Sequence, residues 1–282
     1  MTGQNTQGSL HKSQTNGVAF TLAGVNLIAM GSGALWWQEQ SLLCVSDLHL
    51  GKSERYARAG GAVLPPYQTQ DTLLKLETDL EACRASTVIC LGDSFDHPEA
   101  AGELAEDDRL WINRLQAGRD WIWIEGNHDP GPLEIGGSHR AVLSVHPLFF
   151  QHIAAPDHVA DVMGGEVSGH YHPKARLKTA ARSVSRACFL FDDKRLILPA
   201  YGAYTGGLST GHALLQALMT ALRSGGRCAQ LHSLDLAHNL ISDAGAVAVK
   251  RLLGGSAAAL EDLKNEVKIL NTCSHPNALP LL

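Results

Sequence analysis

The stretch CLGDSFDH (residues 90–97) closes an apolar segment with two carboxylates and an imidazole. The residues that lead into it, 87–91, are apolar and predict a buried strand that stops at a Gly-Asp turn. One carboxylate in such a place would be an ordinary turn residue. Because Asp93 is followed by Asp96 and His97 within four residues, this strand end is a candidate ligand site.

Two other apolar segments resemble the one before Asp93. SLLCVS (41–46) and DWIWIEG (120–126) are both predicted strands. YQTQDTLLKLETDLEAC (67–83) repeats leucine at helical spacing, and ELAEDDRLWINRLQ (103–116) is a second predicted helix. The order strand–helix–strand–helix–strand predicts a parallel sheet with right-handed crossovers, and ligands of such sheets gather beyond the carboxyl ends of the strands.

The flanking segments have other patterns. GVAFTLAGVNLIAMGSGALWW (17–37) is apolar, but four glycines, an asparagine and a serine divide it into strand-length pieces, so paired β-strands are favoured over a membrane span. From about 140 to 208, short strands and Gly-rich turns predict a second, more antiparallel sheet. The polar residues 1–17 predict a disordered tail without a secretory signal, and hence a cytoplasmic protein, or a nuclear one in a eukaryote.

Composition narrows the class of protein. The 282 residues are enough for one large domain or two modest ones, and 45% of them are hydrophobic. The net charge of −5 excludes a surface that attracts nucleic acid everywhere, so any basic patch must be local. Six cysteines without a CxxC pair predict a reducing compartment and no disulfide framework.

Metal-capable residues follow each of the three predicted parallel strands, and two histidines follow later in SGHYHP. In chain order these residues are Asp47 and His49, Asp93 and Asp96, Asn127, His128 and Asp129, and His170 and His172. Each motif alone fits an ordinary turn, but four of them in order favour a shared site. Alternation in an extended chain would let each Asp-x-His or His-x-His pair hold one metal.

The ligand types narrow the choice of metal. Mixed carboxylate, amide and imidazole ligands suit Mn, Fe or Zn better than Ca or Mg, with Mn the first choice. A carboxylate can bridge two ions, and Asp93 is the expected bridge. Asp96 and His97 are expected beside the metals or near the substrate.

These motifs resemble the signature of calcineurin-like metallophosphoesterases. SDLHLGK, LGDSF, GNHDP, SGHYHPKAR and LPAYGAYTGGL are, more narrowly, similar to the ligase-associated DNA-damage-response phosphoesterase family (PdeM). That family usually has His-Asp after GDSF, whereas this chain has Asp96-His97. The resemblance implies a four-layer αββα sandwich over residues 18–212 with two divalent metal ions.

The resemblance also implies which residues bind each ion. Metal one would take Asp47, His49, Asp93 and His172, and metal two would take Asp93, Asn127, His170 and a further histidine. His152, at the end of a strand-like run, is favoured for that last place, with His146 as the alternative.

The implied activity is hydrolysis of phosphodiester or phosphomonoester bonds. The two ions would lower the pKa of a bridging water, whose hydroxide attacks phosphorus in line. His128 would donate a proton to the leaving oxygen, and Asp129 would hold that imidazole. The alternative is a catalytically inactive scaffold of the same fold for protein contacts, which loss of ligands would indicate; here the motif ligands are present.

Basic residues near these motifs suggest the substrate. Lys174 and Arg176 belong to an acid-free segment, 172–186, that begins at a predicted ligand, and Lys52 and Arg55 follow the first motif. Such residues could bind a phosphodiester backbone, DNA above all, although a solvated hairpin also explains the segment. The resemblance further implies association with a DNA ligase or helicase.

Residues 213–282 lie beyond the resembled domain and are expected to form a short, mainly helical, non-functional appendage. Leu231, Leu234, Leu236, Asn239 and Ile241 fit one leucine-rich repeat, which cannot bury its own face. Residues 247–282 instead resemble a kinase fragment with an ion pair between Lys250 and Glu266, and without a Gly-rich loop, HRD or DFG. The two interpretations conflict over 246–253, which must be helix for the first and strand for the second.

Overall fold

The structure is a computed structural model of the 282-residue chain. It describes residues 17–53, 55, 67–131, 133–154, 164–178, 183–192, 194–220, 232–235 and 247–249. None of the described helices is long and apolar enough to cross a membrane. The four described cysteines, at positions 44, 83, 90 and 188, are free thiols.

The first sheet has seven strands in chain order. They are β1 (Gly17–Leu22), β2 (Val25–Met30), β3 (Leu35–Trp37), β4 (Leu42–Val45), β5 (Thr87–Leu91), β6 (Asp120–Ile124) and β7 (Ser138–Arg140). Strands β1 to β4 pair antiparallel, which confirms that the apolar segment after residue 17 forms paired strands. Strands β4 to β7 pair parallel, so the three predicted parallel strands are confirmed.

The second sheet is formed by the later half of the chain. Its strands are β8 (Val142–Val145), β9 (Leu148–Gln151), β10 (Gly165–Ser168), β11 (Lys174–Lys178), β12 (Ser183–Phe191), β13 (Arg195–Ile197), β14 (His232–Asp235) and β15 (Val247–Val249). The order is β15-β14-β12-β13-β10-β9-β8, and β11 pairs with β12. Among the described strands of this second sheet, only the pairs β9–β10 and β10–β13 are parallel. The second sheet is therefore mainly antiparallel, as expected.

The helices follow the predictions with one difference. They are η1 (Gln38–Gln40), α2 (Gln68–Cys83), α3 (Ala100–Glu103), α4 (Glu106–Gln116) and α5 (Ala213–Thr220). The predicted helix over 103–116 begins only at Glu106, because Leu104 and Ala105 have extended ψ angles of 148° and 146°. Two short helices therefore meet at this break instead of one long helix.

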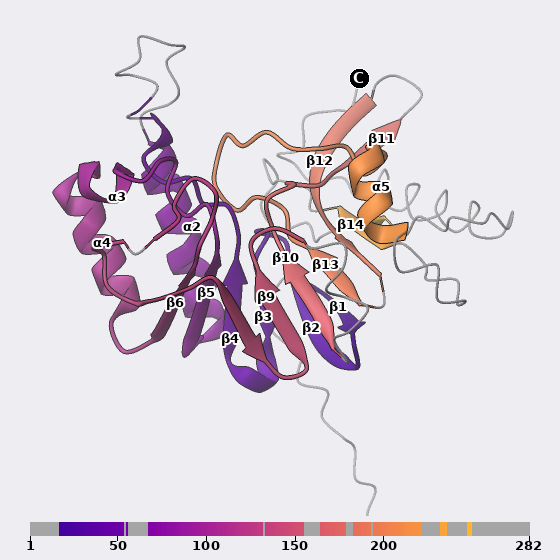
Figure 1. Ribbon diagram of the computed structural model, residues 1–282, viewed down its shortest axis with the longest axis horizontal. Helices are drawn as coiled ribbons and strands as arrows, with labels where there is room; N and C mark the ends of the chain where they lie inside the picture. Colours follow the sequence, from indigo (N-terminus) through magenta and orange to yellow (C-terminus); the bar gives the residue numbers. More distant parts are fainter. Residues whose placement is uncertain are drawn as a thin grey trace, which may run out of the picture.

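Three apolar layers hold the fold together. Alternate residues of β5 face opposite sides of the first sheet: Val88 packs with α2 and α4, and Ile89 packs toward the second sheet. A third cluster joins Leu215 of α5 to Leu190 and Ile197 on the far side of the second sheet. Figure 1 shows α2, α3 and α4 on one flank and α5 on the other. The expected four-layer αββα sandwich is confirmed.

The chain beyond residue 212 is described in part. Helix α5 is bound to the second sheet through the buried Arg195, which donates from Nη1 to the Leu218 carbonyl at 2.6 Å. The other described residues of this segment form two strands, β14 and β15. Within the disputed range 246–253, residues 247–249 are strand. The remaining residues of both interpretations, Lys250 and Glu266 among them, lie outside the described residues.

Candidate metal centre

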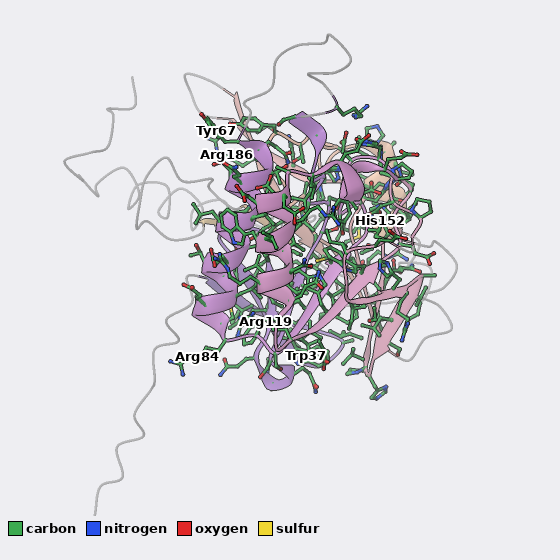
Figure 2. The ribbon with its side chains drawn as sticks, turned by 90° about the vertical axis from the view of Figure 1, so that its left-hand side faces the viewer. Trp37, Tyr67, Arg84, Arg119, His152 and Arg186 are labelled. Atoms are coloured by element: carbon green, nitrogen blue, oxygen red, sulfur yellow. The ribbon has the colours of Figure 1, made fainter. Side chains whose placement is uncertain are left out.

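Most of the predicted metal residues gather at the carboxyl ends of strands. Asp47 and Asp93 follow β4 and β5 in the first sheet, and His152 and His170 follow β9 and β10 in the second. Figure 2 shows His152 well above Trp37, which ends β3 beside the amino end of β4. Because β4–β5 and β9–β10 are parallel pairs, each sheet brings its strand ends to one edge. The two edges meet, since His152 Nε2 after β9 lies 3.3 Å from Asp93 Oδ2 after β5.

A first cluster consists of Asp47, His49 and His172, whose ligand atoms lie within 4.8 Å of one another. Asp47 Oδ1, His49 Nδ1 and His172 Nε2 are buried, and none has a hydrogen-bond partner among the described residues. The His172 and Asp47 atoms lie 2.9 Å apart without hydrogen-bond geometry. Unpaired buried polar atoms are costly. A bound cation would satisfy all three atoms together, so these residues fit a metal ion.

A second cluster consists of Asp93, His152 and His170, again within 4.8 Å. His152 Nδ1 lies 3.0 Å from the Leu91 carbonyl, which can only accept, so Nδ1 donates there and Nε2 is the nitrogen directed at the cluster. His152 Nε2 lies 3.3 Å from Asp93 Oδ2 and 3.2 Å from Asn127 Oδ1. Asn127 therefore belongs to the second cluster.

The two candidate histidines before the GHxH motif lie at opposite ends of β9. His152 follows β9 at its carboxyl end, within the second cluster. His146 is exposed in the turn that precedes the strand. The structure therefore brings His152, and not His146, to the other predicted ligands.

Neither paired motif is extended as expected: Asp47 and His49 still share one cluster, but His170 and His172 do not. The left-handed backbone region is occupied by Asp47 (φ 54°), His49 (φ 48°), Asp93 (φ 45°), His170 (φ 66°) and His172 (φ 44°). The rule for extended chains therefore does not apply, and His170 and His172 enter different clusters instead of holding one site together. Such conformations cost about 1–3 kcal/mol each and persist only where the surroundings impose them.

Backbone hydrogen bonds hold these loops in their unusual conformation. Asp47 N donates to the Gly92 carbonyl at 3.1 Å, and His49 N donates to the Asp93 carbonyl at 3.0 Å. Gly202 N donates to the Asp47 carbonyl at 3.0 Å. The loops after β4 and β5 are thus bonded to each other, which fixes the distance between the two clusters.

Two glycines allow close approach at the site. At Gly92 (φ +76°), a Cβ atom would lie 2.3 Å from the ring of His152. At Gly169, a Cβ would lie 1.8 Å from Ser46 Oγ and 2.7 Å from Asp47 Oδ2. The glycines of the GD and GH motifs therefore make room for ligand side chains that arrive from other strands.

His128 lies at the edge of the site with its side chain 44% exposed. Its backbone N–H donates to Asp93 Oδ1 at 2.9 Å, and its Nε2 lies 4.0 Å from Asp93 Oδ2. Its Nδ1 lies 3.1 Å from the Asp96 carbonyl, so Nδ1 donates there and Nε2 faces the second cluster.

The expectation that Asp129 holds the His128 imidazole is wrong. The Asp129 carboxylate accepts backbone N–H groups from Ser94 at 2.7 Å, Phe95 at 3.1 Å and Gly126 at 3.1 Å. Burial raises its pKa to about 6. Asp129 instead joins the loop after β5 to the loop after β6, because buried N–H groups at strand ends need an acceptor.

The two predicted substrate lysines come from different segments but donate to carbonyls of the same loop. Lys52 donates to the Tyr204 carbonyl at 3.2 Å and Lys174 to the Thr205 carbonyl at 3.0 Å. Neither lysine forms an ion pair with any described residue. Arg176 lies in β11, where only its backbone is described.

The other charged residues near the site are paired. Arg55 donates to Asp96 Oδ2, and Asp96 Oδ1 lies 3.6 Å from His49 Nδ1. His97 is paired with Glu103 at 2.7 Å. Asp96 thus lies between a rim arginine and the first cluster, which agrees with its expected place beside the metals.

The two clusters differ in protonation. Burial lowers the pKa of His49 to about 4, so this imidazole is neutral at pH 7. Burial opposes ionisation of Asp93, but the hydrogen bond and charge of His152 outweigh it and lower that pKa to about 2. Burial also opposes protonation of His152, but its hydrogen bond to Asp93 and the charges of Asp47 and Asp93 raise its pKa to about 9.

Several supporting residues escaped the sequence analysis. Ser46 Oγ donates to Asp47 Oδ2, and Tyr201 N donates to the Ser46 carbonyl at 2.7 Å. Gln68 Nε2 donates to the His49 carbonyl at 3.3 Å from helix α2. Ser46 ends the predicted strand before Asp47, and Tyr201 lies in the segment LPAYGAYTGGL, which is similar to the resembled family; neither position indicated a supporting role. Gln68 carried no signal, because the helix was recognised by its leucines.

The family model of the calcineurin-like phosphoesterases matches residues 41–182, about half of the chain. This segment contains strands β4 to β11 and both candidate clusters. The chain therefore belongs to the calcineurin-like phosphoesterase family, whose members are metal-dependent phosphoester hydrolases.

Solved structures give a second comparison. The chain is similar to the crystal structure of nuclease MPE from Pseudomonas putida, with 21% identity and a TM-score of 0.58, over 83% of this chain and 100% of that one. It also matches a Streptococcus pneumoniae protein described as a predicted phosphoesterase, with 14% identity and a TM-score of 0.28, over 74% and 97% of the two chains. No curated protein matches the chain significantly. At this level of identity the first likeness supports the fold.

Proposed function

We propose that this chain is a two-metal phosphodiesterase that acts on nucleic acid. The observation that carries the proposal is the first cluster, where three buried polar atoms converge without hydrogen-bond partners among the described residues. A scaffold that bound no metal would leave these atoms unsatisfied at a cost of about 1–3 kcal/mol each. The alternative of a catalytically inactive scaffold is therefore disfavoured.

Each ion has a set of ligands in this proposal. Asp47, His49 and His172 would hold one ion; Asp93, Asn127, His152 and His170 would hold the other, with Asp93 shared between the two. The mixture of oxygen and imidazole ligands suits Mn²⁺, with Fe or Zn as the alternatives. When bound, two such cations neutralise phosphate charge and lower the pKa of coordinated water.

The residues of the chain supply orientation and a proton. Because His128 Nδ1 is bound to the Asp96 carbonyl, Nε2 is the nitrogen that can give a proton to the leaving oxygen. Its partial exposure leaves room for a leaving group beside it. Asp129 keeps the loop of His128 in register with the loop of Asp93 through its three backbone hydrogen bonds.

The lysines support nucleic acid as the substrate class. Lys52 and Lys174 have no ion-pair partner among the described residues and donate to the carbonyls of Tyr204 and Thr205, three residues after His49 and two after His172. Two fixed positive charges beside a phosphoester site can hold adjacent phosphates of a polynucleotide. The fold is also that of a Pseudomonas putida nuclease. Association with a DNA ligase or helicase stays a prediction of the sequence resemblance.

One assay tests the proposal directly. The purified full chain with Mn²⁺ is expected to hydrolyse bis-p-nitrophenyl phosphate and single-stranded DNA faster than p-nitrophenyl phosphate. DNA cleavage should fall steeply as salt rises, and Lys52→Ala or Lys174→Ala should each reduce the salt slope by about one while hydrolysis of the small diester stays unchanged. If none of the three substrates is hydrolysed, the proposed function is contradicted. If DNA cleavage does not depend on salt, nucleic acid is rejected as the substrate class, and the phosphoesterase activity stands.

A further inference from the structure

A pocket of about 290 Å³ opens beside the second cluster and extends beyond the proposed metal ligands. It shares Asn127 and His152 with that cluster and extends to Gln151 and Ile153 at the end of β9, Val142 at the start of β8, and Glu125 after β6. Its volume is near the lower end of the range of small-ligand sites, roughly 300–1,000 Å³.

Gln151 is the distinctive polar residue of this pocket. Its side chain is buried, with the residue 9% exposed, and its Nε2 has no hydrogen-bond partner among the described residues. Gln151 pairs directly with Val142 across β8 and β9, so the two side chains lie on the same face of the sheet. A buried primary amide without a partner is costly, and a ligand in the pocket could satisfy it.

Most of the other lining residues that face solvent are apolar, and one is acidic. Val142 is 41% exposed and Ile153 is 43% exposed, and Pro130 and Ala141 complete the lining. Glu125 adds an exposed carboxylate, which would repel a second phosphate group. Exposed apolar side chains beside a buried amide that lacks a partner among the described residues suit an uncharged, flat group with a hydrogen-bonding edge, which is the chemistry of a nucleobase.

The position of the pocket agrees with this occupant. The pocket adjoins the second cluster, whereas Lys52 and Lys174 follow ligands of the first cluster in sequence and are bound to the 204–205 loop. A phosphodiester held at the second cluster would therefore have its attached nucleoside next to the pocket.

We propose that this pocket binds the nucleobase of the nucleotide attached to the scissile phosphate, and that the Gln151 amide hydrogen-bonds its edge. This inference rests on the proposed phosphodiesterase function and adds the group that the site recognises next to the phosphate.

Two esters test the inference by kinetics. Methyl p-nitrophenyl phosphate has no base, whereas the p-nitrophenyl ester of cytidine 5′-monophosphate carries one. With Mn²⁺, the parental chain should show a higher kcat/KM for the nucleoside ester. Gln151→Leu should lower that value about 3- to 10-fold and leave the methyl ester unchanged, because it removes one hydrogen bond at nearly constant volume.

A second variant changes an exposed residue of the pocket, so its effect does not depend on repacking a buried side chain. Ala141→Phe adds a ring at an exposed residue of the lining and should reduce hydrolysis of the nucleoside ester more than tenfold by filling the pocket. Ser144→Phe, at an exposed position of β8 outside the lining, is the matched control and should change neither ester. Gln151→Leu, Ala141→Phe and Ser144→Phe should each still bind two metal ions per chain.

A single-stranded oligonucleotide provides a third arm and distinguishes the source of the base. If the base belongs to a polynucleotide, the oligonucleotide shows the same Gln151→Leu effect; if it belongs to a small nucleotide, only the ester does. Equal kcat/KM for both esters in the parental chain, or equal loss of both esters in Gln151→Leu, would overturn the inference.

A binding measurement separates this inference from the proposed function. In the ¹⁵N-labelled full chain without manganese, added cytidine should shift the Gln151 side-chain amide signals in a saturable way, and Ala141→Phe should abolish the shift. Absence of a shift in the parental chain would contradict the nucleobase pocket even if both esters are hydrolysed. A saturable shift without hydrolysis of either ester would support the pocket and contradict the phosphodiesterase function.

Discussion

The two halves of the metal centre solve the same problem in different ways. In the first cluster, Asp47, His49 and His172 direct buried atoms at one another without forming hydrogen bonds. In the second cluster, Asp93 and His152 form an ion pair at 3.3 Å, and the proton of that pair raises the pKa of His152 against the effect of burial. The first cluster also holds a close pair, Asp47 Oδ1 and His172 Nε2 at 2.9 Å, so the clusters differ mainly in one histidine each: the pKa of His49 is lowered, whereas that of His152 is raised.

This difference predicts an order of binding. A cation entering the first cluster displaces no proton from His49, whose pKa is lowered to about 4 by burial. A cation entering the second cluster must displace the proton of His152. We therefore expect the first site to bind more tightly near pH 7 and the second site to set the metal requirement for activity.

The largest effect is expected at Asp93, the carboxylate assigned to both ions. Asp93→Asn should lower kcat on bis-p-nitrophenyl phosphate by more than about 10³-fold, because one amide cannot replace a shared anionic ligand. Metal analysis should show the second ion lost. Asp96→Asn is the matched control in the same loop and should keep both ions; loss of both ions there, or two ions retained in Asp93→Asn, would refute the ligand assignment.

His128 should affect turnover without affecting metal content. His128→Ala is expected to lower kcat about 100-fold, which is a common contribution of one proton donor. Both ions should remain, since no metal is assigned to this imidazole. Turnover at the parental rate would remove His128 from the mechanism, and loss of an ion would place it among the ligands.

The second cluster can be perturbed selectively through a glycine. Gly92→Ala places a methyl group 2.3 Å from the His152 ring, whereas Gly118→Ala, at almost the same φ of +74°, meets no atom within 4 Å. Both variants should lose about 1–2 kcal/mol from the left-handed backbone, and Gly92→Ala about 1–3 kcal/mol more from overpacking.

Calorimetric metal titration should separate the two glycine variants. Displacement of His152 in Gly92→Ala should weaken the second Mn²⁺ site about 10- to 100-fold, and Gly118→Ala should leave it unchanged. Equal thermal stability and equal Mn²⁺ affinity in the two variants would show that the His152 ring does not pack against Gly92.

The comparison becomes sharper with pH. Because the pKa of His152 is raised to about 9 without metal, Mn²⁺ affinity at the second site should fall about tenfold for each pH unit below that value and level off above it. His49 adds no such slope at the first site above about pH 5.

In the metal-free protein, the raised pKa of His152 also stabilises the fold. This contribution is fully present below about pH 6.5 and is lost as pH rises through about 9.

Calorimetry in buffers of different ionisation enthalpy measures that proton directly. About one proton should be released on filling the second site at pH 7. Release of no proton between pH 6.5 and 8.5 would contradict the difference between the clusters.

The sequence predicted the positions of the ligands better than their grouping. Apolar runs that end in Asp47, Asp93 and Asn127 identify parallel strands, and parallel strands bring their carboxyl ends to one edge, so these residues could be found from pattern alone. Residue alternation wrongly grouped His170 with His172, because the left-handed φ angles that separate them are imposed by tertiary hydrogen bonds; only the family resemblance had assigned them to different ions.

The roles of Asp129 and Gln151 show a second limit. Asp129 stands next to His128 in sequence, yet its acceptor role depends on N–H groups from a loop about thirty-five residues earlier. Gln151 is an ordinary polar residue at a strand end, and only its burial and its missing partner single it out. Contacts between distant segments decide both cases, and periodicity carries no information about them.

The most direct measurement is an anomalous diffraction experiment on crystals of the full chain soaked in Mn²⁺. Two peaks are expected: one in contact with Asp47, His49 and His172, and a weaker one in contact with His152 and His170. Peaks elsewhere on the surface, or none at either place, would contradict the claim that these two sets of side chains exist to hold a pair of cations.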